Sequence, residues 1–170
     1  FIGKCLDSII TQDYTNDKLE VLVVDGMSDD GTREILGAYI QQYTFIRLLD
    51  NPKKIVPTAL NIGIKQAKGK IIMRMDAHSI YNKDYISKCV KYIKEYNVDN
   101  VGGILLTMPG NNTLLGKSIS LALSHPFGVG NAYFRIGSKG PKYVDTVPFG
   151  CYKKGIFEII SLFNENLVRN

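Results

Sequence analysis

Hydrophobic residues recur along the chain in two alternating patterns, one with helical spacing and one as short continuous runs. The first ten residues place Ile2, Leu6, Ile9 and Ile10 on one helical face. The run from 19 to 24 is rich in β-branched residues and ends at an Asp-Gly pair, as a buried strand does at a turn. The same patterns predict further helices within 32–40, 57–67, 85–93 and 114–123, and further strands at 45–49, 71–75 and 101–108.

Residues that favour helix starts stand before three of these helices. Ser28 or Asp29 is expected to cap the second helix, Pro57 to lie in the first turn of the third, and Asn82 to cap the fourth. The stretch 125–141 is rich in glycine and polar residues and has no clear periodicity, so it is expected to form a long loop.

The alternation of helices and strands predicts βαβ units, and hence an α/β fold with a mostly parallel central sheet flanked by helices. The 170 residues suffice for one domain. Ligands of such sheets collect at the carboxyl ends of the strands. Asp25 and Asp76 each end an apolar run and therefore mark the candidate site.

Composition narrows the class of partner. The formal net charge of +5 suits a nucleotide diphosphate, a phospholipid surface or a nucleic acid. Basic residues are scattered and form no basic helix interleaved with aromatics, so nucleic-acid binding is not expected. No apolar run approaches the roughly 20 residues that span a bilayer, and no signal-peptide pattern is present. Cys5, Cys89 and Cys151 form no Cys-x-x-Cys pair and are expected to be reduced thiols of a cytoplasmic protein.

Asp76 and His78 stand two residues apart at the end of the strand predicted at 71–75. A carboxylate oxygen and an imidazole nitrogen suit Mn²⁺, and Mg²⁺ is also possible. Two protein ligands bind such an ion weakly, whereas a nucleotide diphosphate could complete the coordination. A carboxylate that caps the next turn beside a surface histidine would show the same spacing.

Two further clusters are compatible with nucleotide binding. In Asp25-Gly26-Met27-Ser28, the acid could accept hydrogen bonds from a base or ribose, and the glycine lets backbone approach a ligand. Asn51, Lys54 and Asn61 lie before and within the helix that starts near Pro57, where lysines and the helix dipole could meet a pyrophosphate. Taken alone, each of these clusters is explained better by an ordinary solvated turn or by exposed surface lysines.

The clusters occur in the order typical of one enzyme family. The matching segments are Cys5-Leu6-Asp7-Ser8-Ile9 with Gln12, residues 23–32, Asn51-Pro52 with Pro57, residues 59–64, Arg74-Met75-Asp76-Ala77-His78, and residues 144–150. Over almost its whole length the chain resembles the family 2 glycosyltransferases, and most closely the bacterial subgroup that builds exopolysaccharides such as succinoglycan.

The resemblance implies a nucleotide-diphospho-sugar transferase fold of the glycosyltransferase A type, and sugar transfer with inversion at the anomeric carbon. Asp25 then contacts the nucleobase, and Asp76-Ala77-His78 stands where the family has Asp-x-Asp, which binds the ribose and the metal ion. His78 replaces the second acid, so Asp76 and His78 are the expected metal ligands. The expected substrate-binding residues are Asp25, Gly26, Ser28, Asn51, Lys54, Asn61, Arg74, Asp76 and Gly150.

The resemblance also places the missing parts of the enzyme. The family opens with an apolar strand that precedes the first helix found here, and its catalytic base lies in an acidic pair shortly after a segment like 163–170. The base is therefore expected just beyond Asn170, and this chain alone is expected to be inactive. Glu165 matches an acid that precedes the base. Residues 1–110 are expected to bind the nucleotide sugar, and residues 111–170 to form an incomplete acceptor side with a strand near Gly150 that leads into a helix.

The expected reaction is transfer from a nucleotide-diphosphate sugar, by family default a UDP-sugar, to a saccharide or lipid-linked acceptor in bacterial polysaccharide biosynthesis. The enzyme would be cytoplasmic, with possible peripheral association at the inner face of the membrane. A Rossmann-type dehydrogenase or methyltransferase would need a Gly-x-Gly phosphate loop, which the segment after Asp25 does not supply. A nucleotidyltransferase and a non-catalytic sugar-nucleotide-binding domain remain as alternatives.

Overall fold

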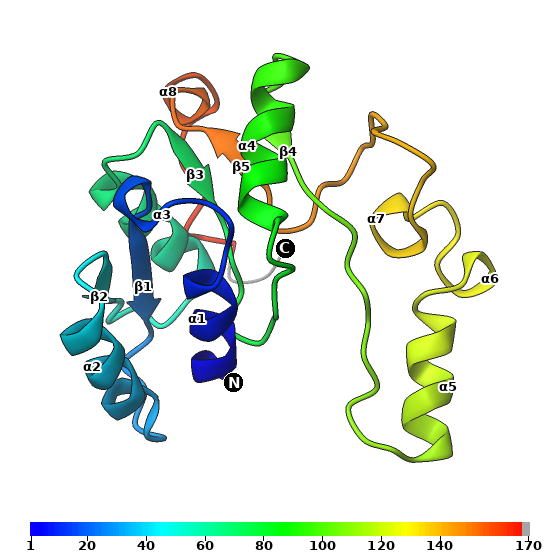
Figure 1. Cartoon of the computed structure of the whole chain (residues 1–170), viewed down its shortest axis with the longest axis horizontal. Helices are drawn as coiled ribbons and strands as arrows, with labels where there is room; N and C mark the ends of the chain where they lie inside the picture. Colours follow the sequence, from blue (N-terminus) through cyan, green and yellow to red (C-terminus); the bar gives the residue numbers. More distant parts are fainter. Residues whose placement is uncertain (168–170) are drawn as a thin grey trace.

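The computed structural model describes residues 1–167 as an α/β fold with two small sheets flanked by helices (Figure 1). The elements in chain order are α1 (Ile2–Ile10), η1 (Asn16–Lys18), β1 (Val21–Asp25), α2 (Thr32–Gln42), β2 (Ile46–Asp50), α3 (Val56–Gln66), β3 (Ile71–Met73), α4 (Tyr85–Glu95), β4 (Asn100–Val101), α5 (Leu114–Ala122), α6 (Pro126–Val129), α7 (Tyr133–Ile136), β5 (Cys151–Lys153) and α8 (Ile156–Ile160). The α/β class and its parallel strand pair are confirmed.

The first sheet pairs β1 with β2 in parallel, and α2 connects them. Asp25 stands opposite Asp50 in the register, so both strands end at the same edge. The core beneath this sheet is made by side chains at helical spacing on α1 and α2, which bury their apolar faces against β2. Its fully enclosed members are Ile2, Leu6, Leu36 and Ile46.

The second sheet has the order β3-β5-β4, and both of its pairings are antiparallel. β5 comes last in the sequence but lies in the middle, where Cys151 is fully buried against Cys89 and Ile93 of α4. The mostly parallel arrangement expected from the sequence therefore holds for β1 and β2, whereas β5 returns in the opposite direction. The predicted strand near Gly150 and the helix after it are present as β5 and α8.

The strand predicted at 101–108 was too long, because the ladder of β4 ends at Val101. Gly102 follows, and a Cβ on this residue would lie 2.5 Å from Cγ1 of Val147. The chain that returns toward β5 therefore crosses too close to Gly102 for the ladder to continue. Residues 104–108 run as an extended segment outside both sheets.

Two of the three predicted helix starts were wrong. Gly31, with φ of 87°, precedes α2, because the Ser28 amide and hydroxyl are bonded to Asp25 instead. Asp84 precedes α4, while the backbone carbonyl of Asn82 accepts hydrogen bonds from the Tyr85 amide and from Nε2 of Gln12. Pro57 lies in the first turn of α3, as predicted.

Residues 104–146 form a separate arm that leaves the body after β4 and returns to β5 (Figure 1). The arm contains α5 and two short helices, α6 and α7, so the loop predicted at 125–141 is partly helical. No residue of these three helices is buried. Within residues 1–167, no helix has the length and hydrophobicity needed to cross a membrane.

Candidate donor site

Asp25 is the last residue of β1 and is only 7% exposed. Its carboxylate accepts hydrogen bonds from the amide and hydroxyl of Ser28 and from Nη1 of Arg33 at 2.9 Å. Burial alone would raise the pKa of Asp25, but the hydrogen bonds from Ser28 and Arg33 outweigh it and lower the pKa below its ordinary value. Asp25 is therefore a fixed, ionised acceptor at the carboxyl edge of the sheet.

Arg33 also contacts the end of the neighbouring strand. Its Nη2 lies 2.7 Å from Oδ1 of Asp50, so one guanidinium bridges the two acids that end β1 and β2. Arg33 was not among the residues expected at the site. The available signal was its place in the first turn of α2, directly after the turn that carries Asp25 and Ser28.

The turns after β1 and β2 are joined through the backbone. The Asn51 amide donates to the Asp25 carbonyl at 2.8 Å, and the Asn51 side chain donates to the Ile55 carbonyl at 3.0 Å. The next turn brings Lys54 against Gly26, where a Cβ on the glycine would lie 3.7 Å from Cα of Lys54. Five of the expected substrate-binding residues thus lie along one edge: Asp25, Gly26, Ser28, Asn51 and Lys54.

Asn61 belongs to a different contact. This buried residue of α3 donates from Nδ2 to the Phe163 carbonyl and to Oε1 of Glu165, both at 2.9 Å, and its Oδ1 accepts from the Phe163 amide. Lys53 pairs with the same glutamate at 2.7 Å. The Asn61 amide is thus occupied by the segment 163–165, which it attaches to α3.

Arg74 and Gly150, also expected at the site, lie side by side. The Arg74 amide donates to the Gly150 carbonyl at 3.1 Å, and the Arg74 guanidinium lies 5.6 Å from the centre of the Phe149 ring. Its Nε is 3.0 Å from Oδ1 of Asp76. The end of β3 and the start of β5 therefore form a second cluster of polar groups around Asp76.

The backbone of Asp76 is fixed on both sides. Its amide donates to the Tyr81 hydroxyl at 2.7 Å, and its carbonyl accepts from the Ser79 amide at 3.0 Å. Burial raises the pKa of Tyr81 to about 12, so this hydroxyl stays protonated at neutral pH. The Cys5 thiol of α1 also points to the Asp76 carbonyl, at 3.6 Å, and burial raises the pKa of Cys5 to about 11. Neither Cys5 nor Tyr81 was expected to support this turn.

The chemistry of Asp76 and His78 suits a divalent cation only in part. Asp76 is partly exposed and His78 is exposed on the same turn, so both can reach a ligand from solvent. Among residues 1–167, no group of three or more His, Cys, Asp and Glu side chains is placed to bind a metal ion. One oxygen and one nitrogen donor therefore fit Mn²⁺ or Mg²⁺ only if a bound ligand supplies further oxygens.

Comparison with known proteins decides the family. The sequence matches the family model described as Glycosyl transferase family 2 over residues 1–158. The chain belongs to glycosyl transferase family 2.

Two curated relatives of the chain come from a bacterium and an archaeon. The chain is 32% identical over 122 residues to the succinoglycan biosynthesis protein ExoA of Rhizobium meliloti, which covers 71% of this chain and 36% of ExoA. It is 27% identical over 176 residues to the dolichyl N-acetyl-alpha-D-glucosaminyl phosphate 3-beta-D-2,3-diacetamido-2,3-dideoxy-beta-D-glucuronosyltransferase of Methanococcus voltae, covering 99% of this chain and 54% of that enzyme. The chain thus spans about a third to a half of the length of such relatives.

Solved structures show the same fold. TarS residues 1–349 from Staphylococcus aureus, in complex with UDP, superposes with a TM-score of 0.74 at 18% identity, covering 99% of this chain and 47% of that structure. The mannosyltransferase PcManGT from Pyrobaculum calidifontis, in complex with GDP-Man and Mn²⁺, gives a TM-score of 0.67 at 23% identity, covering 96% and 43%. The family 2 glycosyltransferase assignment and its A-type fold are thereby confirmed.

Proposed function

We propose that this chain is the donor-binding part of an inverting glycosyltransferase that transfers a sugar from a nucleotide diphosphate, most simply UDP, in polysaccharide biosynthesis. The observation that supports the proposal is the joined edge of β1 and β2. There, in a chain of glycosyl transferase family 2, the ionised Asp25 lies beside Gly26 and the exposed amine of Lys54.

Each group at this edge has a task that fits its chemistry. Asp25 accepts a hydrogen bond from the nucleobase, with Ser28 and Arg33 fixing its orientation. Gly26 allows the nucleotide to approach the backbone, and Asn51 sets the path of the turn that presents Lys54 to the diphosphate. Asn61 acts indirectly, because its amide is bonded to the segment 163–165.

Asp76 and His78 are the proposed ligands of Mn²⁺ or Mg²⁺, with oxygens of the diphosphate completing the coordination. The bound ion supplies positive charge that stabilises the departing nucleoside diphosphate. Arg74 has two tasks here, since it holds the Asp76 carboxylate and lies against Phe149 and Gly150 on the acceptor side.

The transfer itself is a displacement at the anomeric carbon. A lone pair of the acceptor oxygen forms the new bond from the face opposite the diphosphate, which inverts the configuration, and the electrons of the broken carbon–oxygen bond leave with the diphosphate. A carboxylate must take the acceptor proton. We propose that an acidic pair typical of the family supplies this base, and that Glu165, which matches an acid preceding that pair, does not.

The acceptor side is assigned to residues 111–170, with residues 1–110 binding the donor. A hollow of about 310 Å³ lies on the arm, lined by residues 131–134 and 144–146. It combines the aromatic rings of Tyr133 and Phe134 with the carboxylate of Asp145, a chemistry that suits the apolar face and hydroxyl groups of a sugar. The name of the Methanococcus relative specifies a dolichyl phosphate-linked acceptor. A saccharide or lipid-linked acceptor at the cytoplasmic face of the membrane is proposed here too.

Calorimetric titration with UDP, with and without Mn²⁺, tests the donor site. Asp76→Asn and His78→Ala are each expected to weaken metal-dependent binding at least tenfold, because each removes one of two protein ligands. The matched control is His125→Ala, which removes the other histidine of the chain from the arm and should leave binding unchanged. Absence of metal-dependent UDP binding by the folded protein would reject the proposal. Equal losses in the His78 and His125 variants would reject the metal assignment.

A further inference from the structure

The arm directs its polar contacts inward. The Ser120 hydroxyl of α5 donates to the Thr107 carbonyl at 2.5 Å, and Nη1 of Arg135 donates to the Thr107 hydroxyl at 3.0 Å. The Leu105 amide donates to the Phe134 carbonyl at 2.7 Å. These bonds attach the extended segment 104–108 to α5 and α7, so the interior of the arm is largely polar.

The outer surface of the arm is apolar. Leu114 and Leu115 at the start of α5 are 86% and 70% exposed, and Phe127 of α6 is 97% exposed. The partly buried side of α5 carries Gly116 and Ser120 instead. A surface helix of a water-soluble protein shows the opposite pattern. Of the nineteen large hydrophobic side chains exposed within residues 1–167, ten lie on the arm: Ile104, Leu106, Met108, Leu114, Leu115, Ile119, Leu121, Phe127, Tyr143 and Val144.

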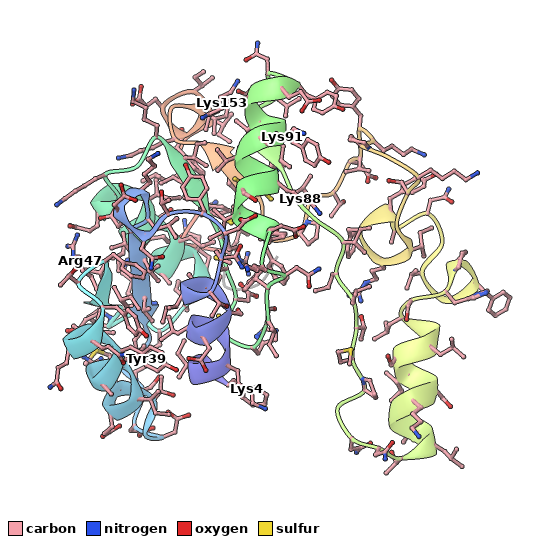
Figure 2. All side chains as sticks on the ribbon, in the orientation of Figure 1. Lys4, Tyr39, Arg47, Lys88, Lys91 and Lys153 are labelled. Carbon is pink, nitrogen blue, oxygen red and sulfur yellow. The ribbon has the colours of Figure 1, made fainter. Side chains whose placement is uncertain are left out.

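The arm is positively charged overall. Residues 104–146 contain four basic residues, Lys117, Arg135, Lys139 and Lys142, and one acid, Asp145. The arm therefore contributes +3 of the net charge of +5. Lys142 Nζ lies 3.5 Å from the centre of the Tyr133 ring, a cation–π contact on the same arm. The side chains of this region stand apart from α1 and α4 of the body (Figure 2).

We propose that the arm is a membrane-docking surface for anionic phospholipid, with the apolar side chains of α5 and Phe127 at the boundary of headgroups and acyl chains. The apolar outer surface of the arm needs an apolar environment, and its net positive charge favours an anionic one. A second copy of the chain would place a net positive charge opposite another, which opposes self-association through this face. With nine residues, α5 can lie on a bilayer but cannot cross it.

This inference deepens the membrane association proposed above and rests on it, but not on the donor chemistry. Vesicle binding and UDP binding are separate measurements, so failure of one leaves the other interpretable. If the arm docks, it brings the hollow lined by Tyr133, Phe134 and Asp145 next to the lipid surface. A lipid-linked acceptor could then reach the hollow without leaving the membrane.

Flotation with vesicles of phosphatidylcholine containing about 30 mol% phosphatidylglycerol tests the docking surface. The protein is expected to float with these vesicles and to remain in solution with pure phosphatidylcholine. Leu114→Ser combined with Leu115→Ser should lower the partition constant at least tenfold, because each buried methylene contributes roughly fourfold. The matched control is Ile159→Ser with Ile160→Ser, two adjacent exposed apolar residues on α8, which should bind as the unaltered protein does.

The charge requirement has its own pair of variants. Lys139→Glu with Lys142→Glu should abolish the preference for anionic vesicles, whereas Lys91→Glu with Lys94→Glu on α4 should preserve it. UDP binding and circular dichroism check that every variant is folded. Equal losses in the arm and control variants would overturn the proposal, as would no flotation at all. So would light scattering that shows a dimer which the two leucine substitutions convert to a monomer.

Discussion

Asn61 and Glu165 are separated by 104 positions in the sequence, yet Nδ2 of Asn61 lies 2.9 Å from Oε1 of Glu165. The same amide group also bonds both backbone groups of Phe163, and Lys53 closes the contact from the other side. The segment 163–165 is therefore attached to α3. The Glu165 carboxylate is bonded on one side to Asn61 and on the other to the amine of Lys53.

Replacing Asn61 with alanine should reduce the free energy of unfolding by about 1–3 kcal/mol, because it leaves the partly buried backbone groups of Phe163 without partners. Urea denaturation measures the change. The control is Asn112→Ala on an exposed part of the arm, which should change stability by less than about 0.5 kcal/mol. An unchanged urea midpoint for Asn61→Ala would show that the 163–165 contact contributes nothing to the fold.

The ion pair of Glu165 predicts a specific dependence on pH. Hydrogen bonds from Lys53 and then Asn61 lower the pKa of Glu165 from its ordinary 4.5 to about 2. A depressed folded pKa stabilises the protein fully above the unfolded pKa, and this stabilisation is lost as the pH falls from 4.5 toward 2. The stability difference between the unaltered protein and Glu165→Gln should therefore be largest near neutral pH and shrink on acidification.

Urea titrations over that pH range measure the difference directly. Glu34→Gln is the control, because Glu34 is an exposed carboxylate of α2 with no ion pair among the described residues. A constant difference between Glu165→Gln and the unaltered protein at every pH would contradict the assignment of the pKa shift to the ion pair.

Arg33 and Arg47 provide a comparison between a bridging and a simple surface arginine. Arg33 pairs with the buried Asp25 and with Asp50. Arg47, labelled at the edge of the body in Figure 2, has Glu20 at 3.4 Å as its one ion-pair partner within residues 1–167. Arg33→Ala leaves a buried carboxylate without its cation, so it should lower the urea midpoint clearly more than Arg47→Ala does. It should also raise the pKa of Asp25, which NMR titration of the carboxyl carbon can follow. Equal urea midpoints for the two variants would indicate that the hydrogen bonds from Ser28 are enough to stabilise the ionised Asp25 carboxylate.

The space around Gly150 leaves no room for a side chain. A Cβ at this position would meet the Tyr152 ring and lie 2.5 Å from the buried Oδ1 atom of Asn100. Gly150→Ala should therefore cost about 1–3 kcal/mol of stability and disturb the Arg74 contact beside Asp76. Gly155→Ala is the matched control, since its Cβ would meet nothing within 4 Å and its φ is −60°. Equal effects of the two substitutions, measured by thermal unfolding, would contradict this account.

The sequence predicted those features that depend on local spacing. The apolar faces of α1 and α4, the strand that ends at Asp25 and the place of Pro57 all follow from neighbours within one or two turns. The resemblance added the strand near Gly150, whose backbone indeed contacts Arg74. These features place Asp25, Gly26 and Lys54 after the two strands whose ends lie at one edge of the sheet in the structure.

The features that the sequence did not reveal depend on contacts between distant segments. The apolar run 101–108 satisfies the pattern of a strand, but only the crossing of Val147 at Gly102 shows where the ladder stops. The bridging role of Arg33 and the Tyr81 bond to Asp76 likewise depend on a folded geometry that no periodicity encodes.

The pairing of β4 with β5 has a consequence for how enzymes of this kind diversify. Val101, just before the arm, lies opposite Cys151, just after it, so the arm enters and leaves the body at the same rung of the sheet. An insertion, deletion or wholesale exchange between these two residues leaves the register of β3, β5 and β4 intact. Evolution can therefore replace the arm as a unit while the residues at the ends of β1, β2 and β3 keep their places.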